Sequence, residues 1–266
     1  MIREIFKTAY ARAYVRIKGV NSDVTHFIID IGLPLIGLSA ILLAYKSLNA
    51  PSQFLAIAAI GGAMMAFWYN VLWGMASQFY WERETGNLPL YISSGAPMPG
   101  VLLGMALGGA VNMTIRAVGV LLATVYLFGI KLYTSEIVPA FFLFLLTLFA
   151  LYSLGMIFAS SFLRFGRSVS KINELLGEPM LFFSGVYFPV KVFPFAIQLI
   201  VSLIPLALGI EGMRELMVFG NSPLQILWIY IVLLLLGIVF FYIATKMIKY
   251  MEERGKTTGT LTLKWE

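Results

Sequence analysis

Few residues in this sequence have the types and spacing needed for covalent catalysis or metal binding. The chain has no cysteine and a single histidine, His26, which excludes thiol chemistry and any mechanism that needs two imidazoles. His26 lies with Asp23 and Asp30 near the start of an apolar run, where a polar helix entrance in the headgroup region is expected. Glu174 and Glu178 share one helix face, but two carboxylates are too few ligands for a metal. The sequence therefore predicts no catalytic residues, no metal site and no enzyme.

The stretch RGKTTG at 254–259 resembles part of a phosphate-binding loop, which would indicate nucleotide hydrolysis. The full loop needs a glycine five residues before Gly255, where this chain has Tyr250. It also needs a strand before it and a helix after it, whereas here the end of a basic helix precedes it. We therefore expect that the chain binds no cofactor and cannot hydrolyse ATP alone.

A polar stripe is the most unusual feature inside an apolar run. Gly104, Gly108, Asn112 and Arg116 recur every four residues and so lie along one helix face. Small residues at this spacing let two helices approach closely, and a buried asparagine or arginine must find a partner or water. The stripe is either a tight packing seam, with Arg116 bonded to neighbouring carbonyl groups, or a polar face that lines a transport path or a dimer seam.

A charged stretch, WERETGNLPLYISSGAPMPG at 81–100, separates two of the apolar runs. Glu82 and Glu84 end the preceding run, because their charges cannot enter lipid. Gly86 permits a turn, and Pro97 ends a short helix before the next run. The apolar face of that short helix consists of Leu88, Leu90, Tyr91 and Ile92. Such a helix can seat in a groove of a partner protein, although an ordinary interfacial loop has the same pattern.

The elements that position these residues are membrane-spanning helices. The 266 residues are 60% hydrophobic and 12% charged, whereas soluble domains carry roughly 25% charged residues. An α-helix needs about 20 apolar residues to cross the hydrocarbon core. Long apolar runs occupy 24–45, 53–77, 101–128, 137–162 and 224–245, and shorter apolar pieces occupy 175–190 and 195–210.

The distribution of basic residues orients these runs. With six spans, the last two being 175–190 and 224–245, both termini and the loops at 78–100 and 163–173 lie on one side. That side holds 14 lysines and arginines, against four on the other side, and Arg116 lies within a span. Because cytoplasmic loops are enriched in basic residues, we expect both termini in the cytoplasm and the chain in the cytoplasmic membrane.

Two further segments are expected to contact the membrane without crossing it. The N-terminal segment 1–20 has Ile2, Ile5, Phe6, Ala9, Ala13 and Ile17 at helical spacing among basic residues, which predicts an amphipathic helix on the membrane surface. A helix packed on a partner is the alternative. The proline-rich segment 190–212 is expected to enter from the outer side and return as two short helices, since broken helices are tolerated where protein covers their backbone.

Together these features resemble the membrane (permease) subunit of a type 2 ABC exporter, and the resemblance covers nearly the whole chain. It depends most on the loop ERETGNLPLYISSGAPM and on IPLALGIEGMREL before the last span. Pro89 departs from the family loop, where an acidic residue is common, and it lies where the loop helix is expected to begin.

The resemblance implies a single all-α transmembrane domain over 1–266, with a coupling loop at 82–99 that receives a separate ATPase subunit. The coupling residues it implies are Glu82, Arg83, Glu84, Thr85, Gly86, Leu88, Leu90, Tyr91, Ile92 and Pro97. Those of the outer segment are Pro205, Glu211, Gly212 and Arg214. ATP and magnesium would bind to the partner, a second permease subunit would complete a dimer, and the substrate would be amphipathic: drug-like, a lipid or a lipid-linked glycan. A secondary transporter or channel without ATP coupling is the alternative.

Overall fold

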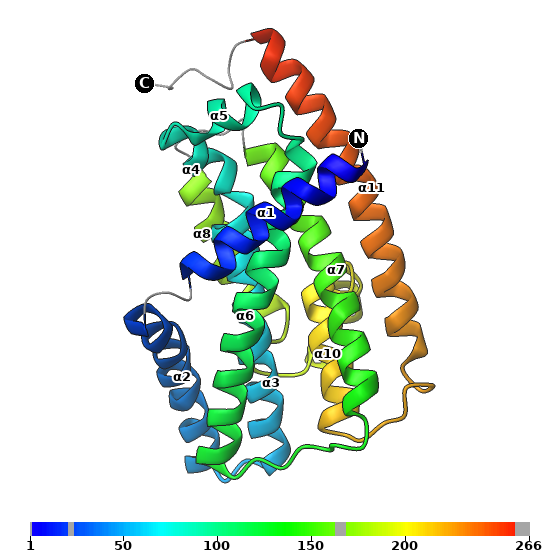
Figure 1. Cartoon of the computed structure of the whole chain (residues 1–266). Coiled ribbons are helices and arrows are strands. Elements are labelled where there is room, and N and C mark those ends of the chain that lie inside the picture. The colour runs from blue at the N-terminus through cyan, green and yellow to red at the C-terminus, as the bar shows by residue number, and fades with distance from the viewer. Residues whose placement is uncertain (1, 21–23, 163–168, 259–266) are drawn as a thin grey trace.

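The computed structural model describes residues 2–20, 24–162 and 169–258, and every regular element in these ranges is helical. Figure 1 shows the long helices side by side in one bundle, with α1 (Ile2–Val20) lying obliquely across it. The predicted fold class, an all-α integral membrane protein, is confirmed. Asp23, Arg164, Arg167 and Lys264 lie outside the described residues, as does the side chain of His26.

Five described helices are long and apolar enough to cross a membrane, and they match the five long runs predicted from sequence. They are α2 (Val24–Ser47), α3 (Ser52–Tyr69) continuing through η1 (Asn70–Ala76) and α4 (Gln78–Glu84), α6 (Met98–Phe128), α7 (Ile137–Phe162) and α11 (Leu227–Thr258). The α3 span is 83% buried inside the protein, against 44% or less for the others. It therefore forms the centre of the bundle.

The predicted span at 175–190 is wrong as a continuous helix. α8 (Val169–Phe183) ends early, and Gly185 follows with a left-handed φ of 66°. α8 nevertheless runs along α3, because the Asn173 amide donates to Ser77 Oγ and the Trp68 indole donates to the Leu176 carbonyl. For this segment to cross the membrane, the non-helical residues 184–189 would have to complete the span that α8 begins.

The outer segment is broken, as predicted. It consists of η3 (Val190–Val192), α9 (Phe195–Val201) and α10 (Pro205–Met217), and α9 and α10 meet at an angle of 104°. α10 continues five residues beyond the predicted boundary at 212 and packs between α3, α7 and α11. If this bent pair counts as one span, the described chain has six candidate spans.

The centre of the second span is a π-helix, η1, which hydropathy does not indicate. A π-turn is wider than an α-turn and needs room on both sides. That room comes from Gly109 in α6 and Gly155 in α7, where an added Cβ would lie 2.4 Å from Asn70 Oδ1 and 2.9 Å from a Val71 methyl group. The same Asn70 oxygen accepts a hydrogen bond of 2.9 Å from the Tyr152 hydroxyl.

The N-terminal helix packs on α6, and only part of its predicted apolar face is covered. Ala9 and Ala13 are buried, and Ile5 and Ile17 are half-buried on the same side. Phe6 is instead 68% exposed, and it lies on the same helix face as the exposed rings of Tyr10 and Tyr14. The small side chains face inward because only they let the two helix backbones come close.

Candidate functional site

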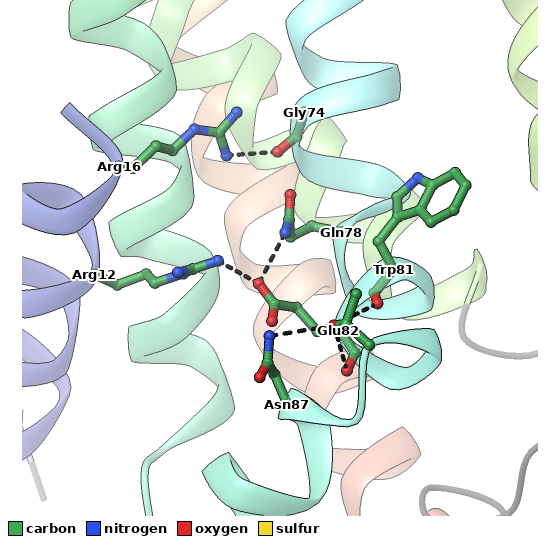
Figure 2. Close-up of polar contacts among 8 residues, drawn as sticks. Arg12, Arg16, Gly74, Gln78, Trp81, Glu82 and Asn87 are labelled. Carbon is green, nitrogen blue, oxygen red and sulfur yellow. Dashed lines mark hydrogen bonds and ion pairs between the residues drawn. The ribbon is translucent and has the colours of Figure 1, made fainter. Parts of the chain in front are cut away.

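The 82–99 loop is a tight turn followed by a short helix. Gly86 joins α4 to α5 (Asn87–Ser93) with a φ of 78°, a conformation that side chains other than glycine rarely adopt. The Thr85 hydroxyl donates to the Trp81 carbonyl at 2.9 Å, and the Asn87 amide donates to the Thr85 hydroxyl at 3.2 Å (Figure 2). The first bond gives a carbonyl in the last turn of α4 a hydrogen-bond donor, and the second joins the two sides of the Gly86 turn.

Pro89 does not delay the start of the loop helix. It is the third residue of α5, within the first turn. The first four backbone N–H groups of a helix have no partner inside that helix, so proline loses no hydrogen bond there. Pro97 and Pro99 lie at the start of α6 for the same reason.

Glu82 joins the loop to α1. Its side chain is 4% exposed and forms an ion pair with Arg12, while the Gln78 amide donates to the same carboxylate oxygen at 2.8 Å (Figure 2). The Arg12 guanidinium also lies 5.9 Å from the centre of the Tyr91 ring in α5. Burial, opposed in part by Arg12, raises the pKa of Tyr91. A buried carboxylate is stable only when it is paired, so α1, α4 and α5 are held together here.

The loop residues divide into a buried set and an exposed set. Glu82, Arg83 and Leu88 are 4%, 4% and 1% exposed, and they are covered by this chain itself. Leu90 is 63% exposed and Trp81 is 47% exposed. Among the exposed residues, we call Trp81, Thr85, Gly86 and Leu90 the loop face, and Glu84, Tyr91, Ile92 and Pro97 are half-buried beside it. A partner protein can contact the loop face without unfolding the loop.

The first three residues of the polar stripe, Gly104, Gly108 and Asn112, pack against α1. An added Cβ on Gly104 would lie 2.6 Å from the Ala9 carbonyl oxygen, and one on Gly108 would lie 3.2 Å from the Ala13 carbonyl oxygen. Farther along, the Asn112 amide donates to the Arg16 carbonyl at 3.4 Å. These three residues of the stripe therefore all lie against one helix, α1.

Changing Gly104 to leucine is expected to push α1 off α6. Overpacking of this kind costs about 1–3 kcal/mol, so we expect roughly a tenfold increase in tryptic cleavage within α1. Peptide mass spectrometry of the timed digest measures this increase. Gly37→Leu is the matched control, because Gly37 has open space where its Cβ would be. Equal cleavage of the two variants would show that the seam does not hold α1.

The last residue of the stripe contacts a different element. The Arg116 guanidinium forms an ion pair of 2.6 Å with Asp30 of α2, rather than bonding to carbonyl groups. Both residues line a cavity of about 410 Å³ between α2, α3, η1 and α6. The stripe is thus a packing seam at one end and a cavity wall at the other.

Arg214 is the central polar residue of the outer segment. It is 1% exposed, and its guanidinium donates to the carbonyls of Ile57 at 2.9 Å, Val186 at 2.7 Å and Phe188 at 3.4 Å. It therefore joins α10, α3 and the turn after α8. Of the other predicted residues, Pro205 begins α10, Glu211 pairs with Lys191 at 3.3 Å, and Gly212 packs on Leu143.

Four residues of these sites were not singled out by sequence. Arg12 and Arg16 counted only as basic charges, yet Arg12 pairs with Glu82 and Arg16 donates to the Gly74 carbonyl at 2.5 Å. Asp30 counted as part of a polar helix entrance, and Asn70 lay unnoticed in an apolar run. For Asp30 and Asn70 the available signal was the position of a polar residue within a span, which by default indicates a partner or a function.

A family model described as ABC-2 type transporter matches residues 7–218. The match runs from within α1 to just past the end of α10, and so includes the 82–99 loop, the polar stripe and the outer segment. A comparison with curated proteins found no matching sequence. The matched region is most of the chain, and its helices are those of a multi-pass membrane protein. The chain therefore belongs to the ABC-2 type transporter family, as a permease subunit of an ABC transporter.

Proposed function

We propose that this chain is the membrane subunit of an ATP-driven exporter and that the loop face receives a separate ATPase subunit. The observation that carries the proposal is Leu90, a large apolar side chain that is 63% exposed on a loop joined to α1 through Glu82. An exposed apolar anchor on a well-held helix is suited to a groove in another protein. The family supports the presence of such a partner.

The proposed mechanism follows from what the loop is attached to. A push on α5 reaches α4 through the Gly86 turn, and α4 is continuous with the central span through η1. The same push reaches α1 through the Glu82–Arg12 ion pair, and α1 lies on α6. ATP and magnesium would bind only to the partner, and two permease subunits in the cytoplasmic membrane, with cytoplasmic termini, would alternate the access of an amphipathic substrate.

The test begins with purification of the tagged chain from membranes of its own source. We expect an ATPase subunit to be recovered with it in equal amount. Reconstituted together in vesicles, the two should move a fluorescent dye or a fluorescently labelled phospholipid only when ATP and magnesium are present. The control is an ATPase subunit whose phosphate-loop lysine is replaced by alanine, which should abolish transport.

The alternative gives a different result. A secondary transporter or channel would be purified without any ATPase subunit, and it would move the same probes along a proton gradient or with no energy source. That pair of results would overturn the proposal.

A further inference from the structure

The cavity between α2, α3, η1 and α6 has the size and the charges of a ligand site. Its volume of about 410 Å³ falls in the range typical of small-molecule pockets. The alanines Ala63 and Ala117 supply apolar wall, and the rings of Tyr69 and Trp73 line another part. Trp73 is 41% exposed, so the cavity is open to the outside of the bundle beside this ring.

Two opposite charges line this cavity, and each has unused hydrogen-bonding capacity. A guanidinium has five N–H donors. The Arg116 side chain is 9% exposed and forms its ion pair with Asp30 through Nη2, and neither Nε nor Nη2 makes a hydrogen bond of ordinary geometry with any residue that the structure describes. The Asp30 carboxylate is 37% exposed and contacts Arg116 through one of its two oxygens, Oδ2. Both groups can therefore bind a ligand while they still contact each other.

The pairing of the charges decides the class of ligand. A simple anion at Arg116 would meet repulsion from Asp30, and a simple cation at Asp30 would meet repulsion from Arg116. A zwitterion places an anionic group on Arg116 and a cationic group on Asp30, and leaves no buried charge unpaired. A phosphate and an ammonium joined by a short linker have this arrangement.

The depth of the cavity fits a lipid headgroup. Asp30 lies 17 residues before the end of α2 at Ser47, about 26 Å along the helix axis. Arg116 lies 12 residues before the end of α6 at Phe128, about 18 Å. Asp30 lies only six residues after the start of α2 at Val24, about 9 Å along the helix axis, so in a hydrocarbon core about 30 Å thick the ion pair lies near the end at which α2 enters the membrane. Tyrosine and tryptophan rings are common at headgroup depth.

We propose that this cavity binds the headgroup of a zwitterionic phospholipid such as phosphatidylethanolamine, with its phosphate on Arg116 and its ammonium on Asp30. The binding needs no ATPase and no transport, so it stands or falls separately from the proposed function.

The test is lipid binding to the delipidated chain in detergent, measured by native mass spectrometry. The probes have the same oleoyl chains and differ in charge: dioleoyl phosphatidylethanolamine, anionic dioleoyl phosphatidylglycerol, and cationic dioleoyl trimethylammonium propane. We expect the ethanolamine lipid to bind at least about tenfold more tightly than either of the other two lipids. This is the gain in affinity that one additional hydrogen bond to a charged group provides.

Two substitutions separate the two charges. Arg116→Gln should weaken binding of both phospholipids by about tenfold. Asp30→Asn should remove the preference for ethanolamine and strengthen binding of the glycerol lipid, because it frees Arg116 for phosphate. Lys249→Gln is the control, since Lys249 is exposed and pairs along its own helix with Glu253.

Equal binding of the three lipids, a preference of the wild type for the glycerol lipid, or unchanged preference in Asp30→Asn would each overturn the proposal. Asp30→Asn also reports on its own folding, because a folded variant still binds phosphatidylglycerol.

Discussion

Replacing Arg214 with methionine is expected to lower the unfolding temperature by about 10 °C. The substitution removes the buried guanidinium that donates to the carbonyls of Ile57, Val186 and Phe188. An unsatisfied buried polar group costs about 1–3 kcal/mol, and this site would have two, the carbonyls of Val186 and Phe188, because the Ile57 carbonyl lies within α3 and keeps its helical donor. Thermal unfolding of the purified protein in detergent, followed by tryptophan fluorescence, measures the shift.

The surroundings of Arg214 give it no alternative arrangement. The Val186 carbonyl oxygen lies where a Cβ on Gly61 would be, only 1.8 Å from that position, so the turn after α8 presses directly on α3. Arg214→Lys is expected to recover part of the loss, because an ammonium keeps the charge but cannot span the same carbonyls. The control is Lys191→Met, an exposed cation of the same segment whose pairs with Glu211 and Glu215 contribute little. Unfolding of Arg214→Met at the wild-type temperature would show that this contact does not hold the outer segment.

Replacing Leu90 with aspartate is expected to abolish ATP-driven transport while the permease stays folded. Leu90 is 63% exposed, so the change removes little contact within the protein. At the proposed interface, a buried apolar anchor becomes a desolvated charge, a change worth roughly 3 kcal/mol or more, which weakens the complex by at least about a hundredfold. Recovery of the ATPase subunit with the tagged variant, together with ATP-driven dye transport in vesicles, measures this loss.

The controls for Leu90→Asp come from the same short helix. Ser93→Asp adds the same charge at another exposed position of α5 and should leave ATPase binding within about threefold of wild type. Leu88→Asp puts the charge at a side chain that is 1% exposed, so it should lower the unfolding temperature instead. If Leu90→Asp retains full ATPase recovery and full transport, the loop face is not the docking site.

Hydropathy was sufficient to locate the long helices, because lipid demands about 20 consecutive apolar residues whatever the helix packs against. The turn at Gly86 was also readable, since its left-handed backbone needs glycine. The fifth span was misjudged for a related reason. An apolar run from 175 to 190 is compatible with the lipid environment, but it does not reveal that the helix ends at Phe183. Nor does it reveal that the Arg214 guanidinium donates hydrogen bonds to carbonyls of the turn that follows.

The sequence by itself determined which segments enter the membrane, where the polar loop interrupts them and which segment is broken, because these properties depend on local composition and on single glycines and prolines. Only the tertiary structure decided which residues meet. Glu82 pairs with an arginine 70 residues away, and Arg116 pairs with Asp30 beside a cavity. A charge within a helix indicates that a partner is required, but its identity depends on how the helices pack, and that packing is set by contacts between residues distant in the chain.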